Sequence, residues 1–342
     1  MSGLPTWGLL AIFLAAAGVI WWAGIILAFT TDAIDSHFGW GEGVGGAVLL
    51  AVATNLPEIA IIIGCAFTNS MELAVGNILG GIAIQTVVLV ILDGPGLRER
   101  IPLMSTVRSL TIVVQGMVLI SVLMFCVIGA LLPRTMIAFR ITPVEVGILI
   151  FWILGVWLTA QNEDRESWRA GHQHMIEAAP KVVRRCTIRK AIALFGVAAC
   201  ATLICGVAIE LASVELAGRF HMSGVIFGAT FLAAVTALPE VTTGLAAVKV
   251  GSFELAISDV IGGNAFLPVL FLLGSLLSGK ALLPDAQGPD LYLTALGALL
   301  TAVYCAGAIF RSRRMLFGTG IDSLIVLALY IIGVAGLFFI RA

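Results

Sequence analysis

Long apolar runs separated by short polar segments occupy most of the chain. A helix needs about 17–25 apolar residues to cross the hydrocarbon core of a membrane. Runs of that length can be placed at 6–29, 42–66, 71–93, 107–132, 143–160, 188–212, 222–248, 253–278, 290–310 and 320–340. The pattern therefore predicts an all-α polytopic membrane protein with about ten transmembrane helices.

The composition agrees with this prediction. Hydrophobic residues make up 60% of the chain and charged residues 11%, with a mean hydropathy of +1.09, whereas soluble domains contain about 25% charged residues. The first run has no basic residue ahead of it and no clear small-residue cleavage site, so we interpret it as a retained helix and not a signal peptide. The six cysteines lack metal-ligand spacing and are expected to be packing residues. We expect the lipid bilayer as a partner, and no nucleic acid.

Lys and Arg are distributed unevenly over the predicted loops, and basic residues in short loops resist translocation. One side has Arg98, Arg100, Arg108, Arg165, Arg169, Lys181, Arg184, Arg185, Arg189, Lys190, Lys249, Arg311, Arg313 and Arg314. The other side has Arg134, Arg140, Arg219, Lys280 and Arg341. We therefore predict a plasma (inner) membrane protein with the polar stretch 161–187 in the cytoplasm and both termini outside. His172 and His174 in that stretch are interpreted as solvated and not as metal ligands.

The two halves of the chain are related at a constant separation of 182 residues. "GAVLLAVATNLPEIA" at 46–60 aligns without a gap with "GATFLAAVTALPEVT" at 228–242, and "SMELAVGNILGGIA" at 70–83 aligns with "SFELAISDVIGGNA" at 252–265. Because each half has an odd number of predicted helices, the second half enters the membrane upside down. We predict two inverted five-helix repeats: residues 1–160 with a motif at 46–85, and residues 188–342 with a motif at 228–267, joined by a cytoplasmic linker at 161–187.

Glu58 and Glu240 occupy equivalent positions inside apolar runs that contain no Lys, Arg or His. A charge at mid-bilayer costs about 2.5–3.5 kcal/mol on insertion scales. The compensating charge must therefore be a proton, an imported cation, or both in turn. Inverted symmetry brings equivalent points together near the midplane, so the two carboxylates are expected to face one another. Like charges at short range cannot both stay ionised without help.

The neighbouring residues suit a hard cation. Thr54 and Thr236 lie four positions before the glutamates, on the same helical face. Pro57 and Pro239 have no N–H, which frees the carbonyls four residues earlier. Together these oxygens approach the six to eight, roughly, that Ca²⁺ takes, and they also suit Na⁺. The alternative interpretation is that the prolines only kink the helices and that the glutamates are protonated in helix contacts.

A second motif follows in each half, "GNILGG" at 76–81 and "SDVIGGN" at 258–264. Its small residues lie where helices must approach closely. Asn77 and Asp259 are equivalent, so the second half carries a third buried acid, for which we predict a role in ion binding or proton movement. Ser258 and Asn264 belong to the same segment.

Paired Thr-x-x-Pro-Glu segments, each followed by a Gly-Asn-x-x-Gly or Ser-Asp-x-x-Gly helix, resemble the α-repeats of the sodium/calcium exchanger family within the cation/Ca²⁺ antiporter superfamily. The resemblance implies that Glu58 and Glu240 are Ca²⁺ ligands, with Thr54 and Thr236 beside them. It also implies alternating access, in which the first helix of each repeat slides over a fixed core. The expected function is antiport that exports Ca²⁺ in exchange for Na⁺, with no resident cofactor.

Several positions depart from the family pattern. Asn55 and Ala237 stand where members commonly have Ser, and Gln85 and Leu267 stand where sodium-coupled members usually have Asn or Asp. Oxygen ligands expected around flanking Na⁺ sites are therefore missing. An H⁺-coupled antiporter for Ca²⁺ or another cation remains an alternative. The candidate cation ligands are Glu58, Glu240, Thr54, Thr236, Asn55, Asn77, Asp259, Ser258, Asn264 and Gln85.

A function of a different class, an intramembrane enzyme or a passive cation channel, must be compared with the antiporter. We do not expect an enzyme, because only Asp259 has a setting similar to that of an intramembrane aspartyl protease, and His37 and His221 lie near helix ends. A channel stays open as an alternative, although inverted repeats around a midplane site favour alternating access.

Overall fold

The computed structural model describes residues 1, 3–38, 46–94, 101–107, 110–134, 140–170, 187–249, 251–337 and 339–340. Part of the predicted orientation rests on residues outside these ranges, namely Arg98, Arg100, Arg108, Lys181, Arg184, Arg185 and Arg341. His172 and His174 also lie outside the described residues. The cytoplasmic placement of 161–187 therefore stays a prediction.

The described part of the chain is built almost entirely from helices. The first half contains α1 (Thr6–Phe38), α2 (Gly46–Thr54), α3 (Leu56–Thr68), α4 (Met71–Asp93), the 3₁₀ turn η2 (Leu103–Thr106), α5 (Thr111–Leu131) and α6 (Pro143–Ala170). The second half contains α7 (Ile188–Arg219), α8 (Gly224–Phe227), the π-helical turn η4 (Gly228–Leu232), α9 (Ala233–Thr236), α10 (Leu238–Lys249), α11 (Phe253–Phe266), η5 (Leu267–Val269), α12 (Leu270–Ser278), η6 (Leu283–Asp285), α13 (Gly288–Phe310) and α14 (Ile321–Leu337). Between α13 and α14, β1 (Met315–Leu316) and β2 (Thr319–Gly320) form an antiparallel hairpin with Met315 opposite Gly320.

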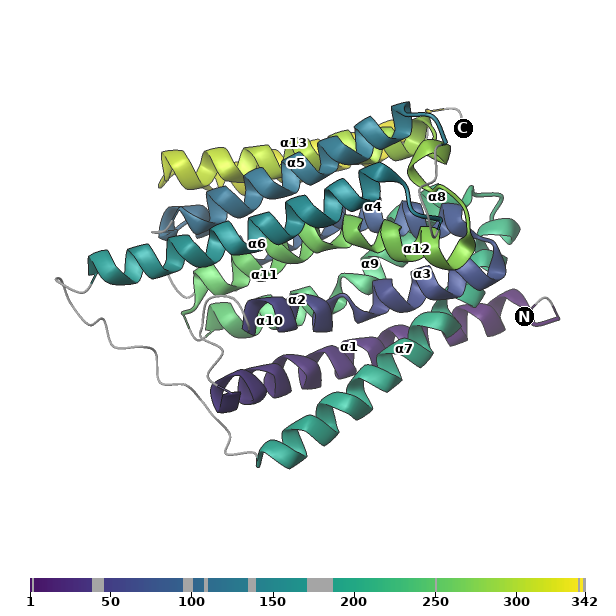
Figure 1. Cartoon of the computed structure of the whole chain (residues 1–342), viewed down its shortest axis with the longest axis horizontal. Helices are drawn as coiled ribbons and strands as arrows, with labels where there is room; N and C mark the ends of the chain where they lie inside the picture. Colours follow the sequence, from purple (N-terminus) through teal and green to yellow (C-terminus); the bar gives the residue numbers. More distant parts are fainter. Residues whose placement is uncertain are drawn as a thin grey trace.

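The helices lie side by side in one bundle, with the N and C termini at the same end (Figure 1). Among the described residues, eight helical segments are long and apolar enough to cross a membrane, and α3 and α14 are shorter apolar helices. The predicted all-α, multi-pass architecture is confirmed. Helix α6 continues to Ala170, so the helix extends beyond residue 160 into the segment predicted to be the linker.

Two of the crossings are interrupted in the middle. The first breaks at Asn55, between α2 and α3, and the second breaks at the equivalent Ala237, between α9 and α10. Two residues after each break stands a proline, which cannot donate to the carbonyl four residues earlier. Each break therefore starts a new helix whose first turn contains Glu58 or Glu240. A carboxylate is stabilised at this position because the first turn of a helix is the positive end of its dipole.

The first helix of each half packs against the interrupted helix of the other half. A Cβ added at Gly24 of α1 would lie 3.0 Å from Cβ of Pro239 on α10. A Cβ added at Gly206 of α7 would lie 2.4 Å from Cβ of Ala60 on α3. Since Gly24 and Gly206 are equivalent positions of the repeat, the exchange is symmetric. Helices α1 and α7 also cross each other, so a single helix pair touches both glutamate segments.

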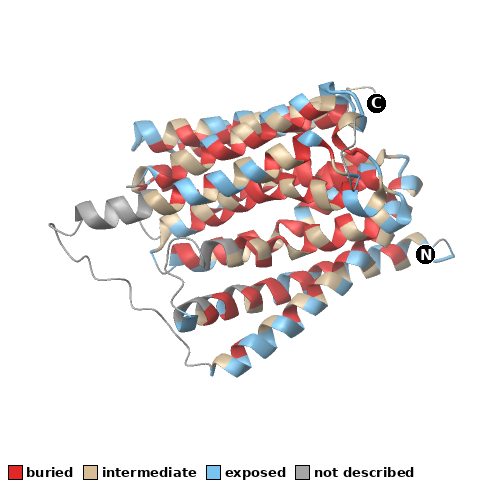
Figure 2. Cartoon of the chain, in the orientation of Figure 1, coloured by how far each residue is buried: buried red, intermediate tan, exposed pale blue. Residues whose placement is uncertain are grey.

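Buried residues are concentrated on the helices in the middle of the bundle (Figure 2). Most residues of α4 are buried, including the polar Asn77, Gln85 and Thr86. By contrast, α7 exposes large apolar side chains such as Val197 and Ile204, as expected where a helix faces lipid. Helices α4 and α11 thus form the centre of the bundle, beside the two helix breaks.

The close approach of α4 to the second half depends on a missing side chain. A Cβ at Gly80 would lie 2.2 Å from Cα of Ala229 in η4, so backbone would have to move. We expect Gly80→Ala to lower the free energy of unfolding by about 1–3 kcal/mol, as overpacking does. Gly196→Ala on α7 is the matched control, because nothing lies within 4 Å of its added Cβ. Thermal unfolding of both variants in detergent tests this; equal melting temperatures would contradict the tight contact.

Candidate cation-binding site

The two predicted glutamates are buried and lie within electrostatic range of each other. Glu58 and Glu240 are each 1% exposed, and the charge of Glu58 acts on Glu240, as does that of Asp259. The Thr236 hydroxyl of the second half lies close to the Glu58 carboxyl of the first. Residues of both halves therefore lie near the Glu58 carboxyl.

Helix α4 makes hydrogen bonds to Glu58 in its own half and to residues of the second half. Gln85 donates from Nε2 to Oε1 of Glu58 at 3.1 Å. Thr236 donates to Oδ1 of Asn77 at 3.4 Å. Asn264, which comes from α11, donates to the carbonyl of Ile82 at 3.3 Å. The contacts of Asn77 and Asn264 thus cross between the two halves, whereas Gln85 contacts Glu58 within the first half.

The polar residues at the breaks make local contacts. Asn55 donates from Nδ2 to the carbonyl of Ala51 at 2.6 Å, and the Thr54 hydroxyl lies 3.3 Å from the same carbonyl. Asn55 also faces the second half, since its Nδ2 lies 3.2 Å from the position of a Cβ added at Gly263. The Asn55 amide therefore lies between the Ala51 carbonyl and α11.

Most of the buried polar atoms in the site that have no hydrogen-bond partner are acceptors. Six oxygens of its described residues have no hydrogen-bond partner: Oδ1 of Asn55, Oε2 of Glu58, Oε1 of Gln85, both carboxylate oxygens of Glu240, and Oδ1 of Asn264. Only one donor, Nδ2 of Asn77, is in the same state. Buried polar groups normally have partners. An excess of acceptors is what a cation, supplied from outside the protein, would satisfy.

The site differs from a resident metal centre in its ligands. Among the described residues, no group of three or more His, Cys, Asp or Glu side chains is arranged to hold a metal ion. A cation would instead be held by two carboxylates together with neutral amide, hydroxyl and carbonyl oxygens, which are hard ligands typical for Ca²⁺ and Na⁺.

Ser258 is the predicted ligand that the contacts support least. It is only partly buried, and the hydrogen bonds described around the carboxylates do not include it. It neighbours Asp259 in sequence, but adjacent helical residues point in different directions.

Two threonines at the site were missed by sequence reasoning. Thr243 donates to Oδ2 of Asp259 at 2.6 Å, and the Thr86 hydroxyl lies 3.4 Å from Nδ2 of Asn264. The repeat comparison could not find Thr243, because its equivalent in the first half is Ile61. The signal that could have found it is spacing, since Thr243 lies three residues after Glu240 and on the same helical face.

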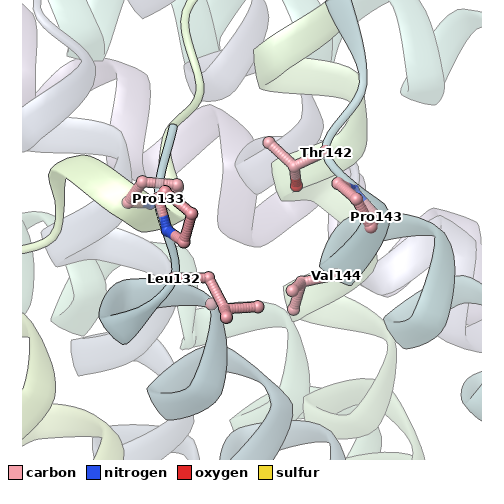
Figure 3. Close-up of a pocket in the computed structure, with 7 residues that line it drawn as sticks. Leu132, Pro133, Thr142, Pro143 and Val144 are labelled. Atoms are coloured by element: carbon pink, nitrogen blue, oxygen red, sulfur yellow. The ribbon is translucent and has the colours of Figure 1, made fainter. Parts of the chain in front are cut away.

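A small cavity of about 110 Å³ lies elsewhere, between the end of α5 and the start of α6 (Figure 3). Leu132, Pro133, Pro143 and Val144 give it a mainly apolar lining, with Thr142 as a polar neighbour. It contains none of the candidate ligands, and we assign it no role in ion binding.

Comparison with known proteins identifies a family. The family model described as "sodium/calcium exchanger protein" matches residues 8–161 and 190–339, once in each half. The inner membrane protein YrbG of Escherichia coli is 26% identical over 285 residues, which cover 82% of this chain and 83% of YrbG. The putative antiporter CaxA of Alkalimonas amylolytica is 24% identical and covers 86% of this chain and 89% of CaxA.

Solved structures share the fold. The H⁺/Ca²⁺ exchanger CAX aligns with a TM-score of 0.68 at 13% identity, over 97% of this chain and 87% of CAX. The sodium-calcium exchanger NCX_Mj aligns with a TM-score of 0.58 at 19% identity, over 99% of this chain and 100% of NCX_Mj. At these identities the likeness concerns the fold alone, and it supports the two-repeat architecture.

The hydrogen bond from Gln85 generates a prediction about cation affinity. Gln85→Leu removes the donor that positions Glu58, and a hydrogen bond to a charged group contributes about 1.5–3 kcal/mol. We therefore expect equilibrium ⁴⁵Ca²⁺ binding to the purified protein to weaken by about tenfold or more. Gln115→Leu on α5 is the control, because Gln115 makes no described hydrogen bond to Glu58 or Glu240. Equal affinities of the two variants would show that Gln85 does not position the carboxylate.

Proposed function

Because the chain belongs to the sodium/calcium exchanger protein family, we propose that it is a secondary cation antiporter that exports Ca²⁺ in exchange for Na⁺. Glu58 and Glu240 are its central ligands, and Thr54, Thr236, Asn55, Asn77, Asp259, Asn264 and Gln85 surround them. The observation that carries the proposal is the pair of buried carboxylates, one from each repeat, that lie close enough to interact electrostatically. No described basic residue pairs with them, and two negative charges match one divalent cation.

The packing of α1 and α7 supports alternating access. Each of these helices touches the interrupted helix of the opposite half, at Pro239 or at Pro57 and Ala60. A movement of the pair across the bundle would therefore change access to both glutamates together. A passive channel would need both ends of the path open at once, which this arrangement does not favour.

In an antiporter, the coupling ion must replace Ca²⁺ at the two carboxylates on the return step. Na⁺ can use the neutral oxygens that remain unsatisfied beside Glu58 and Glu240. A proton is the second candidate, and one observation favours it. Leu267 is apolar and buried at the position equivalent to Gln85, and both stand where sodium-coupled members of the family usually have Asn or Asp. Protons would need none of these missing ligands.

The cellular placement is part of the same proposal. The relative YrbG is described as an inner membrane protein, and we propose the same membrane for this chain. With both termini outside and 161–187 in the cytoplasm, export would carry Ca²⁺ towards the end of the bundle where the termini lie (Figure 1).

Transport by proteoliposomes tests the central site. Glu240→Gln removes one of the two buried charges, and we expect gradient-driven ⁴⁵Ca²⁺ uptake to fall by at least about tenfold, the equivalent of about 1.4 kcal/mol. Glu215→Gln on α7, where the glutamate is only partly buried, should leave uptake unchanged. If the Glu240→Gln protein transports like the wild type, Glu240 is not a ligand.

A comparison of Na⁺ and H⁺ gradients tests which ion is coupled to Ca²⁺ transport. We expect an outward Na⁺ gradient to accelerate ⁴⁵Ca²⁺ uptake into wild-type proteoliposomes, and an outward H⁺ gradient to have no effect once Na⁺ is absent. Acceleration by the H⁺ gradient alone would replace Na⁺ with protons as the coupling ion. Uptake that needs neither counter-ion would identify a channel instead of an antiporter.

A further inference from the structure

Glu210 on α7 is a buried carboxylate outside the central site. Its side chain is 0% exposed and lies against α3. Other buried acids, such as Asp93, Glu145 and Asp290, each accept a hydrogen bond from a backbone N–H and so fix a turn or a helix end. Glu210 instead accepts hydrogen bonds from two hydroxyl groups, and the Cys65 thiol of α3 lies close to it. A role in capping backbone therefore does not account for it.

One oxygen of Glu210 and two hydroxyl oxygens form a closed triangle of contacts. Oε1 of Glu210 is 2.7 Å from Oγ1 of Thr68 and 3.0 Å from Oγ of Ser70, and the two hydroxyl oxygens are 2.6 Å apart. The two hydroxyls supply two protons for these three contacts. One contact is therefore left to a shared hydrogen, to an additional proton or to a cation.

The rest of the carboxylate also lacks a partner. Oε2 of Glu210 is buried with no hydrogen bond, and it lies 3.0 Å from the position that a Cβ on Gly64 would take. The Thr68 hydroxyl is also 3.1 Å from the carbonyl of Gly64, which adds another acceptor. Acceptor oxygens thus gather at this point, and one of them, Oε2, is buried without a hydrogen bond, as several are in the central site.

Nearby basic groups are engaged elsewhere. Lys280 donates to Oδ1 of Asn69 at 2.5 Å, at the exposed rim. Arg219, at the end of α7, donates to Oγ1 of Thr6 and to the carbonyl of Leu4. Neither contact reaches the Glu210 carboxylate, so its charge is not neutralised by these groups.

A pocket of about 330 Å³ adjoins the cluster. It is lined by Asn69, Ser70 and Glu72 at the start of α4, and by residues of α7 and α8 that include Val214 and Gly224. Ser70 connects the two, since it lines the pocket and bonds to Glu210. The pocket lies at the end of the bundle that carries the N terminus, because α3 and α7 both end there (Figure 1).

We propose that Glu210, Thr68 and Ser70 form a second cation site, which binds Ca²⁺ at the N-terminal end of the bundle before or after its passage through the central site. Carboxylate and hydroxyl oxygens are the ligands that such a hard cation prefers, and Glu72 adds negative charge to the adjoining pocket. The equivalent of Glu210 in the first half is Ala28, so the site exists on one face of the membrane only. The choice of Ca²⁺ rests on the proposed function.

Equilibrium ⁴⁵Ca²⁺ binding to the purified full-length protein tests the second site separately from transport. We expect the wild type to bind at two sites and the Glu58→Gln/Glu240→Gln variant to retain one. Adding Glu210→Gln should abolish this residual binding. Adding Glu215→Gln, which changes a neighbouring glutamate on α7, should leave it intact. Melting temperatures of all variants confirm that the compared proteins are folded.

A second variant, which leaves Glu210 in place, controls for a folding defect in Glu210→Gln. Thr68→Val/Ser70→Ala keeps the carboxylate and removes the hydroxyl ligands, and it should weaken the residual binding by about tenfold. No residual binding in the Glu58→Gln/Glu240→Gln variant, or residual binding that survives Glu210→Gln, would overturn the second site. If Glu58→Gln/Glu240→Gln binds as much as the wild type while Glu210→Gln removes binding, the second site stands and the central-site proposal fails.

Discussion

The charges of Glu58 and Glu240 are the constraint on which the rest of the structure depends. Two carboxylates lie buried in a membrane-spanning bundle, and no described Lys, Arg or His forms an ion pair with them; the ion pair described is between Arg134 and Asp285. The cost of burying them is reduced in two ways, by the helix N-termini at which both lie and by the amide of Gln85. The remainder must come from a proton or a cation. In the proposed antiporter that ion leaves and is replaced, which is what distinguishes a transport site from a structural one.

The helix breaks and the repeat could be predicted from sequence because both halves carry them. Proline has one physical consequence in a helix, the loss of an N–H, and its recurrence at 57 and 239 beside a glutamate identified the two broken crossings. The multi-pass architecture followed from the length of the apolar runs. What the sequence did not contain was the choice of neighbours: the exchange of α1 and α7 between the halves depends on close contacts at Gly24 and Gly206, and glycines are too common in membrane helices to indicate a partner.

The residues that sequence reasoning missed have a property in common. Thr243 and Glu210 correspond to Ile61 and Ala28 in the first half, so a comparison of the halves passes over them. The same comparison found Glu58 and Glu240 because they match. Their contacts, to Asp259 and to Thr68 with Ser70, join segments that only the fold brings together. A comparison of the two halves therefore finds the residues that both halves share and misses the residues that occur in one half only.

This difference between matched and unmatched residues bears on how the transporter works. If the two halves were identical, the inverted symmetry would give the states open to either side the same energy, and cations would bind equally well from both faces. The matched residues, the glutamates, prolines and glycines, are the parts that both states would share in the proposed alternating access. Any intrinsic preference between the faces must come from unmatched pairs such as Asn77 with Asp259, Gln85 with Leu267, and Ala28 with Glu210. Two of these pairs place a carboxylate in the second half only, so the asymmetry is electrostatic and acts directly on a cation.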